Sequence, residues 1–168
     1  MKKLFFPLLS LCLLTTACKD SVPSPTIEMQ GLYVNDGEMD YTRQMEALPP
    51  LKVDDELEIS LKLDGNGEEL NTFLVKEETP GSKETAVEID FNDLPEETLS
   101  DDKEFTEKDN GKLGFKDGVS QTQIGIRAKV QQVTEDGVKL KFYLFSKPVN
   151  CEGAKYELEI KTSDKQDD

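Results

Sequence analysis

The chain contains no histidine in its 168 residues. Histidine is the usual general base beside a serine or cysteine nucleophile, and it is also a common ligand of zinc. Its absence excludes Ser-His-Asp and Cys-His catalysis and any histidine-based zinc site. We therefore expect no enzyme, no catalytic residue, no metal site of this kind and no cofactor.

Basic residues are scarce. The chain has 20 Lys and Arg against 35 Asp and Glu, which gives a formal net charge of −15. A protein with this excess of negative charge repels phosphate backbones and anionic lipid headgroups. No basic cluster interrupts the pattern along the chain. We therefore expect no nucleic-acid partner.

The start of the chain has the organisation of an export signal. Lys2 and Lys3 supply positive charge, and Leu4–Leu14 is an uncharged, largely apolar run of eleven residues. This run is too short to cross a bilayer core of ~30 Å, which needs roughly 20 helical residues. Small residues then precede Cys18. This order of charged, apolar and small residues predicts a signal peptide at 1–17.

The segment Leu14–Cys18 (LTTAC) resembles a lipobox, the site where lipoprotein signal peptidase cuts before a diacylated cysteine; Thr15 stands where a leucine is usual. The resemblance implies lipidation of Cys18 with fatty-acyl chains such as palmitate. One acyl chain binds a membrane only marginally, so two or three chains imply stable anchoring without a transmembrane helix. The alternative is ordinary secretion with a cysteine that carries no lipid.

The residues after the cysteine bear on the final location. Cys18, Lys19 and Asp20 resemble the export signal of surface lipoproteins in Bacteroidetes-type bacteria, which often carry a lysine and acidic residues at this place. A polar tether without special meaning is an equal alternative. We expect an outer-membrane lipoprotein held by its lipid anchor, exposed on the cell surface if the export reading holds.

Only one cysteine is left for the folded domain. Cys12 lies in the expected signal peptide and Cys18 is the expected lipid site, so Cys151 has no partner for an intramolecular disulfide. Removing Lys2 and Lys3 with the signal peptide leaves 18 basic and 35 acidic residues, a net charge of −17. The mature protein is thus more acidic than its precursor.

The chain after the signal peptide divides into three parts. The segment 18–26 is polar and contains two prolines, which predicts an extended, lipidated tether. Residues 27–162 are long enough for a single domain with its own core. The last residues, 163–168, are polar with nothing to bury, which predicts a disordered tail.

Alternation of apolar and polar residues recurs through the predicted domain. This period-two pattern is typical of half-buried strands. It is clearest at 57–63, 70–76, 87–91, 124–130, 138–144 and 154–160, and weaker strands are expected at Thr26–Val34 and Lys112–Lys116. No segment has the pattern of an amphipathic helix, although Asp93–Lys103 has room for one helical turn.

About seven or eight short strands separated by turn residues predict an all-β, antiparallel, immunoglobulin-like sandwich. A small lipocalin-like barrel is the alternative. Asp64-Gly65-Asn66-Gly67 and Asp136-Gly137 are typical of hairpin turns. We therefore expect one hairpin over Leu57–Lys76 and one sheet formed by the meander Thr122–Lys161.

One turn also suggests a cation site. Asp64, Asn66, Glu68 and Glu69 place oxygen atoms around two glycines, as a calcium loop does. The EF-hand pattern fails, because its twelfth position is Val75 rather than glutamate. Glycine and asparagine are also what a tight turn requires. The plain turn is the preferred interpretation, and Asp64, Asn66 and Glu68 remain weak calcium candidates.

Three other patterns are each compatible with a binding site and with a simpler structural role. The stretch Glu88–Asp109 holds ten acidic residues, which suits a cation or a partner but is more typical of a solvated loop. Adjacent carboxylates such as Asp54 and Asp55 point to opposite faces of a strand, so they cannot flank one glycosidic bond. Tyr143 and Phe145 fall on the face opposite the buried positions of their strand, where they either meet a ligand or pack under a loop.

The whole pattern resembles a group of short lipoproteins of Bacteroidetes type that pair a lipobox with one all-β domain of unknown function. The resemblance implies no active site. We expect a non-catalytic binding or accessory module for an outer-membrane protein or a glycan. The alternative is a structural subunit of a cell-envelope assembly, joined by pairing of edge strands.

Overall fold

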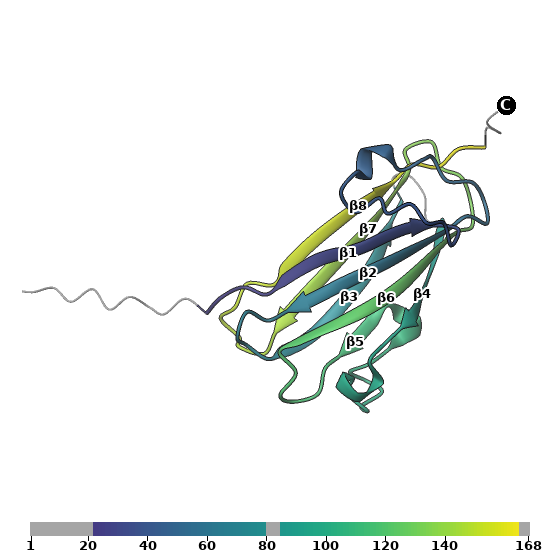
Figure 1. Cartoon of the computed structure of the whole chain (residues 1–168). Helices are drawn as coiled ribbons and strands as arrows, with labels where there is room; N and C mark the ends of the chain where they lie inside the picture. Colours follow the sequence, from purple (N-terminus) through teal and green to yellow (C-terminus); the bar gives the residue numbers. More distant parts are fainter. Residues whose placement is uncertain (1–21, 80–84, 165–168) are drawn as a thin grey trace, which may run out of the picture.

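The computed structural model describes residues 22–79 and 85–164, which form eight strands in two four-stranded sheets (Figure 1). The first sheet has the order β1-β2-β6-β4 and the second has the order β5-β3-β7-β8. The strands are β1 (Thr26–Val34), β2 (Glu56–Asp64), β3 (Leu70–Glu78), β4 (Val87–Asp93), β5 (Lys112–Gly114), β6 (Gln121–Val130), β7 (Val138–Ser146) and β8 (Ala154–Ile160). Three short 3-10 helices, η1 (Met45–Ala47), η2 (Glu96–Thr98) and η3 (Lys108–Asn110), lie in the connections.

The prediction of an all-β antiparallel sandwich is confirmed. Every strand pair in the two sheets is antiparallel. The barrel alternative is wrong, because β1 and β4 end one sheet and β5 and β8 end the other. The order β1-β2-β6-β4 is that of the A-B-E-D sheet of immunoglobulin domains, and β3-β7-β8 is that of their C-F-G sheet. The short β5 adds a strand beside β3.

The core lies between the sheets and follows the alternation of the sequence. On β2 every second residue from Leu57 to Leu63 is buried, and the residues between them are partly exposed. The same alternation occurs on β7. Phe73 of β3 and Phe142 of β7 stack with ring centroids 6.3 Å apart. Buried apolar surface contributes roughly 25 cal/mol per Å², so this layer supplies the main stabilisation of the fold.

The two expected hairpins are wrong. The turn after Asp64 leads from β2 in the first sheet to β3 in the second, and the turn at Gly137 leads from β6 to β7 in the same way. Both sides of β2 are already occupied by β1 and β6, so β3 finds no free edge there. Of the expected meander, only β7 and β8 pair. A tight turn reverses the chain, but it does not specify which sheet the next strand joins.

Smaller expectations agree with the structure. β1 spans Thr26–Val34 as expected, and β5 is a shorter version of the strand expected at Lys112–Lys116. The expected helical turn in Asp93–Lys103 is η2. Among the described residues, no helix combines the length and the hydrophobicity that crossing a membrane requires.

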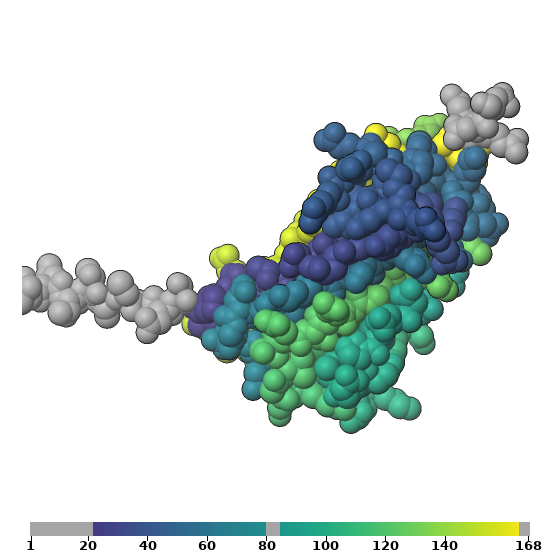
Figure 2. All heavy atoms as spheres, in the orientation of Figure 1, coloured from purple at the N-terminus to yellow at the C-terminus, as the bar shows by residue number. Residues whose placement is uncertain are grey.

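The sandwich has two distinct ends. We call the end where β1 begins the tether end; it also contains the β2–β3 turn (65–69) and the β7–β8 loop (147–153). The opposite, distal end contains the long β1–β2 connection (35–55). In Figure 2 that connection, in dark blue, forms a raised mass beside the purple β1. A chain anchored before β1 therefore presents its distal end away from the anchor.

Candidate functional site

The suggested calcium loop is a turn whose polar atoms bind the protein itself. Asp64 Oδ1 accepts a hydrogen bond from the Asn66 amide at 2.8 Å, and Asp64 Oδ2 accepts one from Gln121 at 2.8 Å. The Asn66 backbone has φ of 53°, and its side chain donates to the Ser24 carbonyl at 2.6 Å. Within residues 22–79 and 85–164, no three acidic or cysteine side chains gather as a metal site would require. The turn therefore fastens the chain just before β1 to the tether end.

We expect calcium to leave the melting temperature of the protein unchanged. A ligand that binds only the native state must stabilise it, so a site with useful affinity would raise the midpoint in about 5 mM calcium chloride. The measurement is a thermal melt in this buffer, in EDTA, and in magnesium chloride as a matched divalent control. A rise with calcium that magnesium does not produce would restore the calcium interpretation of Asp64, Asn66 and Glu68.

A second cluster at the tether end is built around Lys147. Its ammonium lies 2.7 Å from Glu69 Oε2 and also pairs with Asp117. The hydrogen bond that Lys147 donates lowers the pKa of Glu69, and a second one likewise lowers that of Asp117. The same two hydrogen bonds, the one to Asp117 first and the one to Glu69 second, raise the pKa of Lys147. The three charges thus join the end of β7 to the β2–β3 turn and the β5–β6 loop.

Two other sequence candidates also lie at or near this end. Tyr143 and Phe145 do lie on the face of β7 opposite its buried residues, and Phe145 is 42% exposed. A Cβ added at Gly153 would lie 2.7 Å from the Phe145 ring, so that ring packs against the β7–β8 loop. The Cys151 thiol is free and donates to the Pro23 carbonyl at 3.2 Å. Both contacts hold the tether end together.

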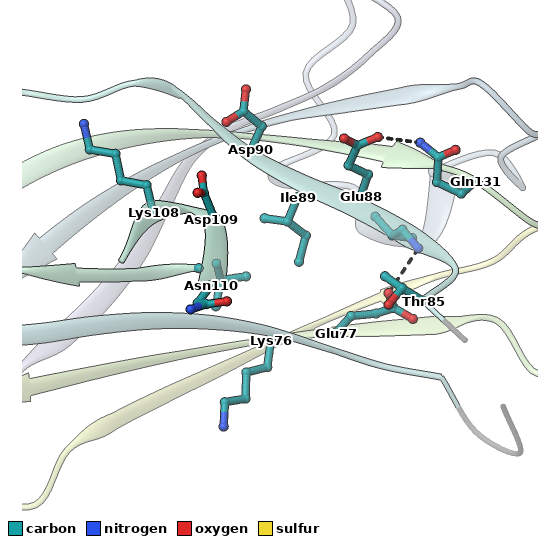
Figure 3. A pocket seen from close by; sticks show the side chains of 13 residues that line it. Lys76, Glu77, Thr85, Glu88, Ile89, Asp90, Lys108, Asp109, Asn110 and Gln131 are labelled. Carbon is teal, nitrogen blue, oxygen red and sulfur yellow. Dashed lines mark hydrogen bonds between the residues drawn. The ribbon is translucent and has the colours of Figure 1, made fainter. Parts of the chain in front are cut away.

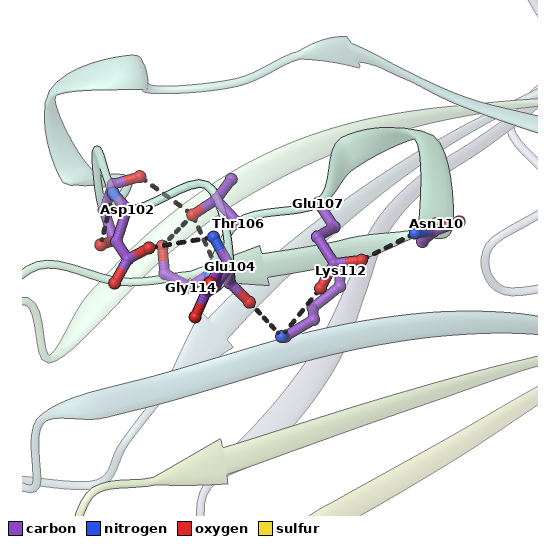
Figure 4. Close-up of polar contacts among 8 residues, drawn as sticks. Asp102, Glu104, Thr106, Glu107, Asn110, Lys112 and Gly114 are labelled. Carbon is purple, nitrogen blue, oxygen red and sulfur yellow. Dashed lines mark hydrogen bonds and ion pairs between the residues drawn. The ribbon is translucent and has the colours of Figure 1, made fainter.

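The acidic stretch after β4 folds into a compact connection, drawn in Figure 4. The Thr106 hydroxyl donates to the Ser100 carbonyl at 3.0 Å and accepts from the Gly114 amide at 3.2 Å. Glu107 accepts from Asn110 at 2.7 Å and from Lys112 at 3.3 Å. These two hydrogen bonds, that of Asn110 being the stronger, lower the pKa of Glu107. Much of the acidic stretch therefore serves local structure.

A groove of about 750 Å³ lies between β3 and β4, which belong to different sheets; η3 adjoins it (Figure 3). We call it the β3–β4 groove. Its apolar lining consists of Val75 and Val87, both buried, and of Ile89, which points into the groove. Its polar lining consists of Lys76, Glu77, Thr85, Glu88, Asp90, Lys108, Asp109, Asn110 and Gln131. Polar residues thus dominate the lining and the apolar floor is small, a composition that suits recognition by hydrogen bonds and charge more than enclosure of an apolar molecule.

The outer edge of β4 faces this groove. On β6, the Val130 N–H and C=O form hydrogen bonds with the backbones of Asp55 and Asp54, on the side away from β4. Val87 of β4 lies opposite Val130, so these two residues form no hydrogen bonds with each other. The Val87 N–H and C=O therefore point away from β6. Glu77 of β3 accepts the Val87 amide at 3.1 Å and the Ala86 amide at 3.0 Å. Glu77 therefore caps the first residues of β4 from across the groove.

The same alternation applies to Ile89, two residues further on. Its N–H and C=O also point away from β6, toward the groove, because backbone groups alternate sides along an antiparallel strand. No hydrogen bond from another part of the described chain reaches the Ile89 backbone. The next amide, that of Phe91 on the same side, is bound by the Asp90 carboxylate at 2.8 Å. Within residues 22–79 and 85–164, the Ile89 backbone thus has one donor and one acceptor without a partner at the groove.

The mouth of the groove is acidic. Figure 3 shows Glu88 and Asp90 projecting from β4 on the side opposite Ile89, Asp109 of η3 on the other side of that strand, and Lys76 directed away. Lys108 Nζ lies 2.6 Å from Glu96, so its charge is largely balanced outside the groove. Glu88 accepts a hydrogen bond from Gln131 at 2.7 Å. The groove therefore combines apolar side chains, an outer strand edge and an excess of negative charge, with four carboxylates against two lysines along its lining. Lys129 of β6 faces Glu88 across the ladder and balances part of this charge.

Sequence reasoning did not identify this groove. In the sequence, Glu88, Asp90 and Asp109 belong to a long acidic stretch, and Ile89 is one apolar residue of an alternating strand. Glu77 carries no sequence signal at all. The groove exists because β3 and β4 belong to different sheets, which alternation along the chain does not reveal.

Comparison with known proteins adds a family and no activity. No curated protein matches the chain. The family described as a domain of unknown function, DUF5035, matches residues 18–162, which are most of the chain and include every strand of the sandwich. The chain therefore belongs to the DUF5035 family.

Proposed function

We propose that this protein is a lipid-anchored, non-catalytic binding module of the outer membrane, which uses the β3–β4 groove to bind an envelope protein or a glycan. Lipids on Cys18 hold it at the bilayer. The part of the predicted tether before Pro23 gives the sandwich reach, because Pro23 and Ser24 are held to the sandwich and Thr26 already belongs to β1. The observation that carries the proposal is the position of the groove. It opens beside the first residues of β4 and the last residues of β3, at the distal half of the domain.

Several features support the anchoring part of the proposal. The lipobox-like segment ends at Cys18, and the family match begins at the same residue. Ser24 and Pro23 are each held by a hydrogen bond to the tether end. The chain thus leaves the sandwich at one defined end, and an anchor there orients the groove away from the membrane.

A binding role rather than catalysis suits the chemistry of the groove. Its carboxylates lie at an open, water-accessible mouth, and the chain has no histidine to act as a general base. Ile89, which is partly exposed above the buried Val75 and Val87, offers apolar area for burial, and the rim offers donors and acceptors for specificity. These are the requirements of recognition.

The test is photo-crosslinking in intact cells from a photoreactive amino acid at Asp109, which is an exposed residue of the groove rim. The matched control carries the same amino acid at Glu135, an exposed acidic residue of the β6–β7 loop outside the groove. We expect a discrete adduct from position 109 and none from position 135. Failure to obtain an adduct from position 109, or equal adducts from both, contradicts a binding role of the groove. An adduct of two copies of this chain would instead support the structural-subunit alternative.

A further inference from the structure

We infer that the β3–β4 groove accepts an extended, positively charged polypeptide segment, which pairs with the outer edge of β4 at Ile89. The inference rests on the proposed function and narrows its partner to one class. Three independent features of the groove lead to it: the free backbone edge, the apolar floor and the charge of the mouth.

The backbone edge requires a partner that can both donate and accept. The Ile89 N–H and C=O point into the groove, and the Val87 C=O points to the same side. Exposed strand edges of this kind bind peptides by strand addition, in which main-chain hydrogen bonds provide affinity. Glu77 occupies the Val87 amide and so limits how far a bound segment reaches toward the β3–β4 connection.

The floor accepts side chains from one face of such a segment. Val75 and Val87 are 3% and 1% exposed, and Ile89 is only partly buried and projects into the groove. Because side chains alternate along a strand, a bound segment directs every second residue onto this floor. No residue that lines the groove is aromatic, so the groove lacks the ring platform that favours a sugar. Apolar residues at alternate positions fit it instead.

The charge at the mouth determines which side chains fit at the other positions of the bound segment, those that point away from the floor. Glu88, Asp90 and Asp109 line it, and the nearby Lys108 is already paired with Glu96. The protein as a whole carries a net charge of −15. Opposite charge across an interface speeds association and disfavours partners of like charge. Lysine or arginine at the outward positions of the segment complements this mouth.

The experiment uses the purified full chain and two synthetic probes. The first probe is a blocked peptide of alternating valine and lysine, about seven residues long, which matches the length of a typical strand. The second replaces each lysine with glutamate. Binding is followed by fluorescence anisotropy of the labelled peptide. We expect saturable binding of the lysine peptide only, and a several-fold weaker affinity when the salt concentration rises from about 0.05 to about 0.5 M, because salt screens exposed charges.

Two variants separate edge pairing from general attraction. Ile89→Pro removes the free N–H without breaking the ladder with β6, because that N–H points outward. We expect Ile89→Pro to weaken binding about tenfold or more, the effect of one lost hydrogen bond and its unpaired acceptor. Ile89→Val keeps the N–H and most of the apolar surface, and we expect it to stay within about twofold of the unaltered protein.

The folding of Ile89→Pro is checked by its melting temperature. If this variant unfolds, Asp109→Asn provides the second test, because the Asp109 carboxylate makes no hydrogen bond or ion pair within the described residues. We expect Asp109→Asn to weaken binding of the lysine peptide about threefold, with an unchanged melting temperature.

The outcomes separate this inference from the proposed function. Equal binding by Ile89→Pro and Ile89→Val overturns edge pairing, and equal binding of both peptides overturns the charge preference. An adduct from position 109 in cells, together with no binding of the lysine peptide, refutes the inference and leaves the proposed function intact. Absence of both the adduct and peptide binding refutes both.

Discussion

Replacing Cys18 by serine together with Thr15 by alanine, which leaves small residues at the two positions that an ordinary signal peptidase requires, is expected to move nearly all of the protein from the membrane fraction to the soluble fraction of the cell envelope. Each buried methylene of an acyl chain contributes ~0.8 kcal/mol to membrane binding, so two or three chains dominate every other contact with the bilayer. Serine has no thiol to accept the first lipid. The remaining protein has 18 basic and 35 acidic residues after loss of the signal peptide, so it is repelled by anionic headgroups.

The measurement combines fractionation of cells with metabolic labelling by an alkyne-bearing fatty acid. Cys151→Ser is the matched control, because it changes the one other cysteine outside the expected signal peptide. We expect Cys151→Ser to remain in the membrane fraction and to carry the label. If the Thr15→Ala/Cys18→Ser variant stays in the membrane fraction and is still labelled, the lipid anchor at Cys18 is wrong. If it stays there without label, a protein partner rather than lipid holds the domain in place.

Alternation along single strands predicted most of the fold. The segment Leu57–Leu63 places four apolar residues on one face, and all four are buried in β2. A side-chain period of two belongs to one strand alone, so it can be read without knowing the partner strand. For this reason the positions of β1, β6, β7 and β8 agreed with the sequence, and so did the all-β class.

The same alternation does not predict which strands pair with each other. Gly67 and Gly137 have φ of 98° and 70°, so both turns are as tight as the sequence suggested. A tight turn, however, serves a hairpin within one sheet and a crossing between two sheets equally well. Strands compete for the two edges of β2, and β1 and β6 occupy them. β3 therefore buries its apolar face in the other sheet, where it pairs with β7. That competition involves residues far apart in the chain.

The candidate site was hidden for a related reason. Residue type alone drew attention to Asp64 and Asn66, whose polar atoms prove to bind Gln121 and Ser24. The groove depends instead on Glu77 of β3 and Ile89 of β4. In the sequence both are ordinary strand residues, and only the topology of the two sheets places them on opposite sides of one groove. Charge composition gave a partial signal, because the acidic stretch after β4 does supply the mouth of the groove.

Substitution of Phe142 by alanine is expected to lower the free energy of unfolding by about 3–5 kcal/mol, the usual cost of removing a buried phenylalanine. The Phe142 side chain is fully buried, and its ring lies 6.3 Å from Phe73 and 6.1 Å from Tyr156, measured between centroids. The lost contacts therefore belong to both β3 and β8. Single domains have a free energy of unfolding of about 5–15 kcal/mol, so this one substitution removes a large share of that free energy.

Phe145→Ala is the matched control, because the same residue type lies three positions away on β7 and on the opposite face. It is 42% exposed and packs mainly against the β7–β8 loop, so we expect its substitution to cost less than about 1.5 kcal/mol. Urea denaturation of the three proteins measures both differences. The exposed face of β7 is the reason for the contrast: the strand has one face in the core and one in water, and only the first holds the two sheets together. Equal losses for the two variants would mean that the sheets do not pack through Phe142, and the sandwich described here would be wrong.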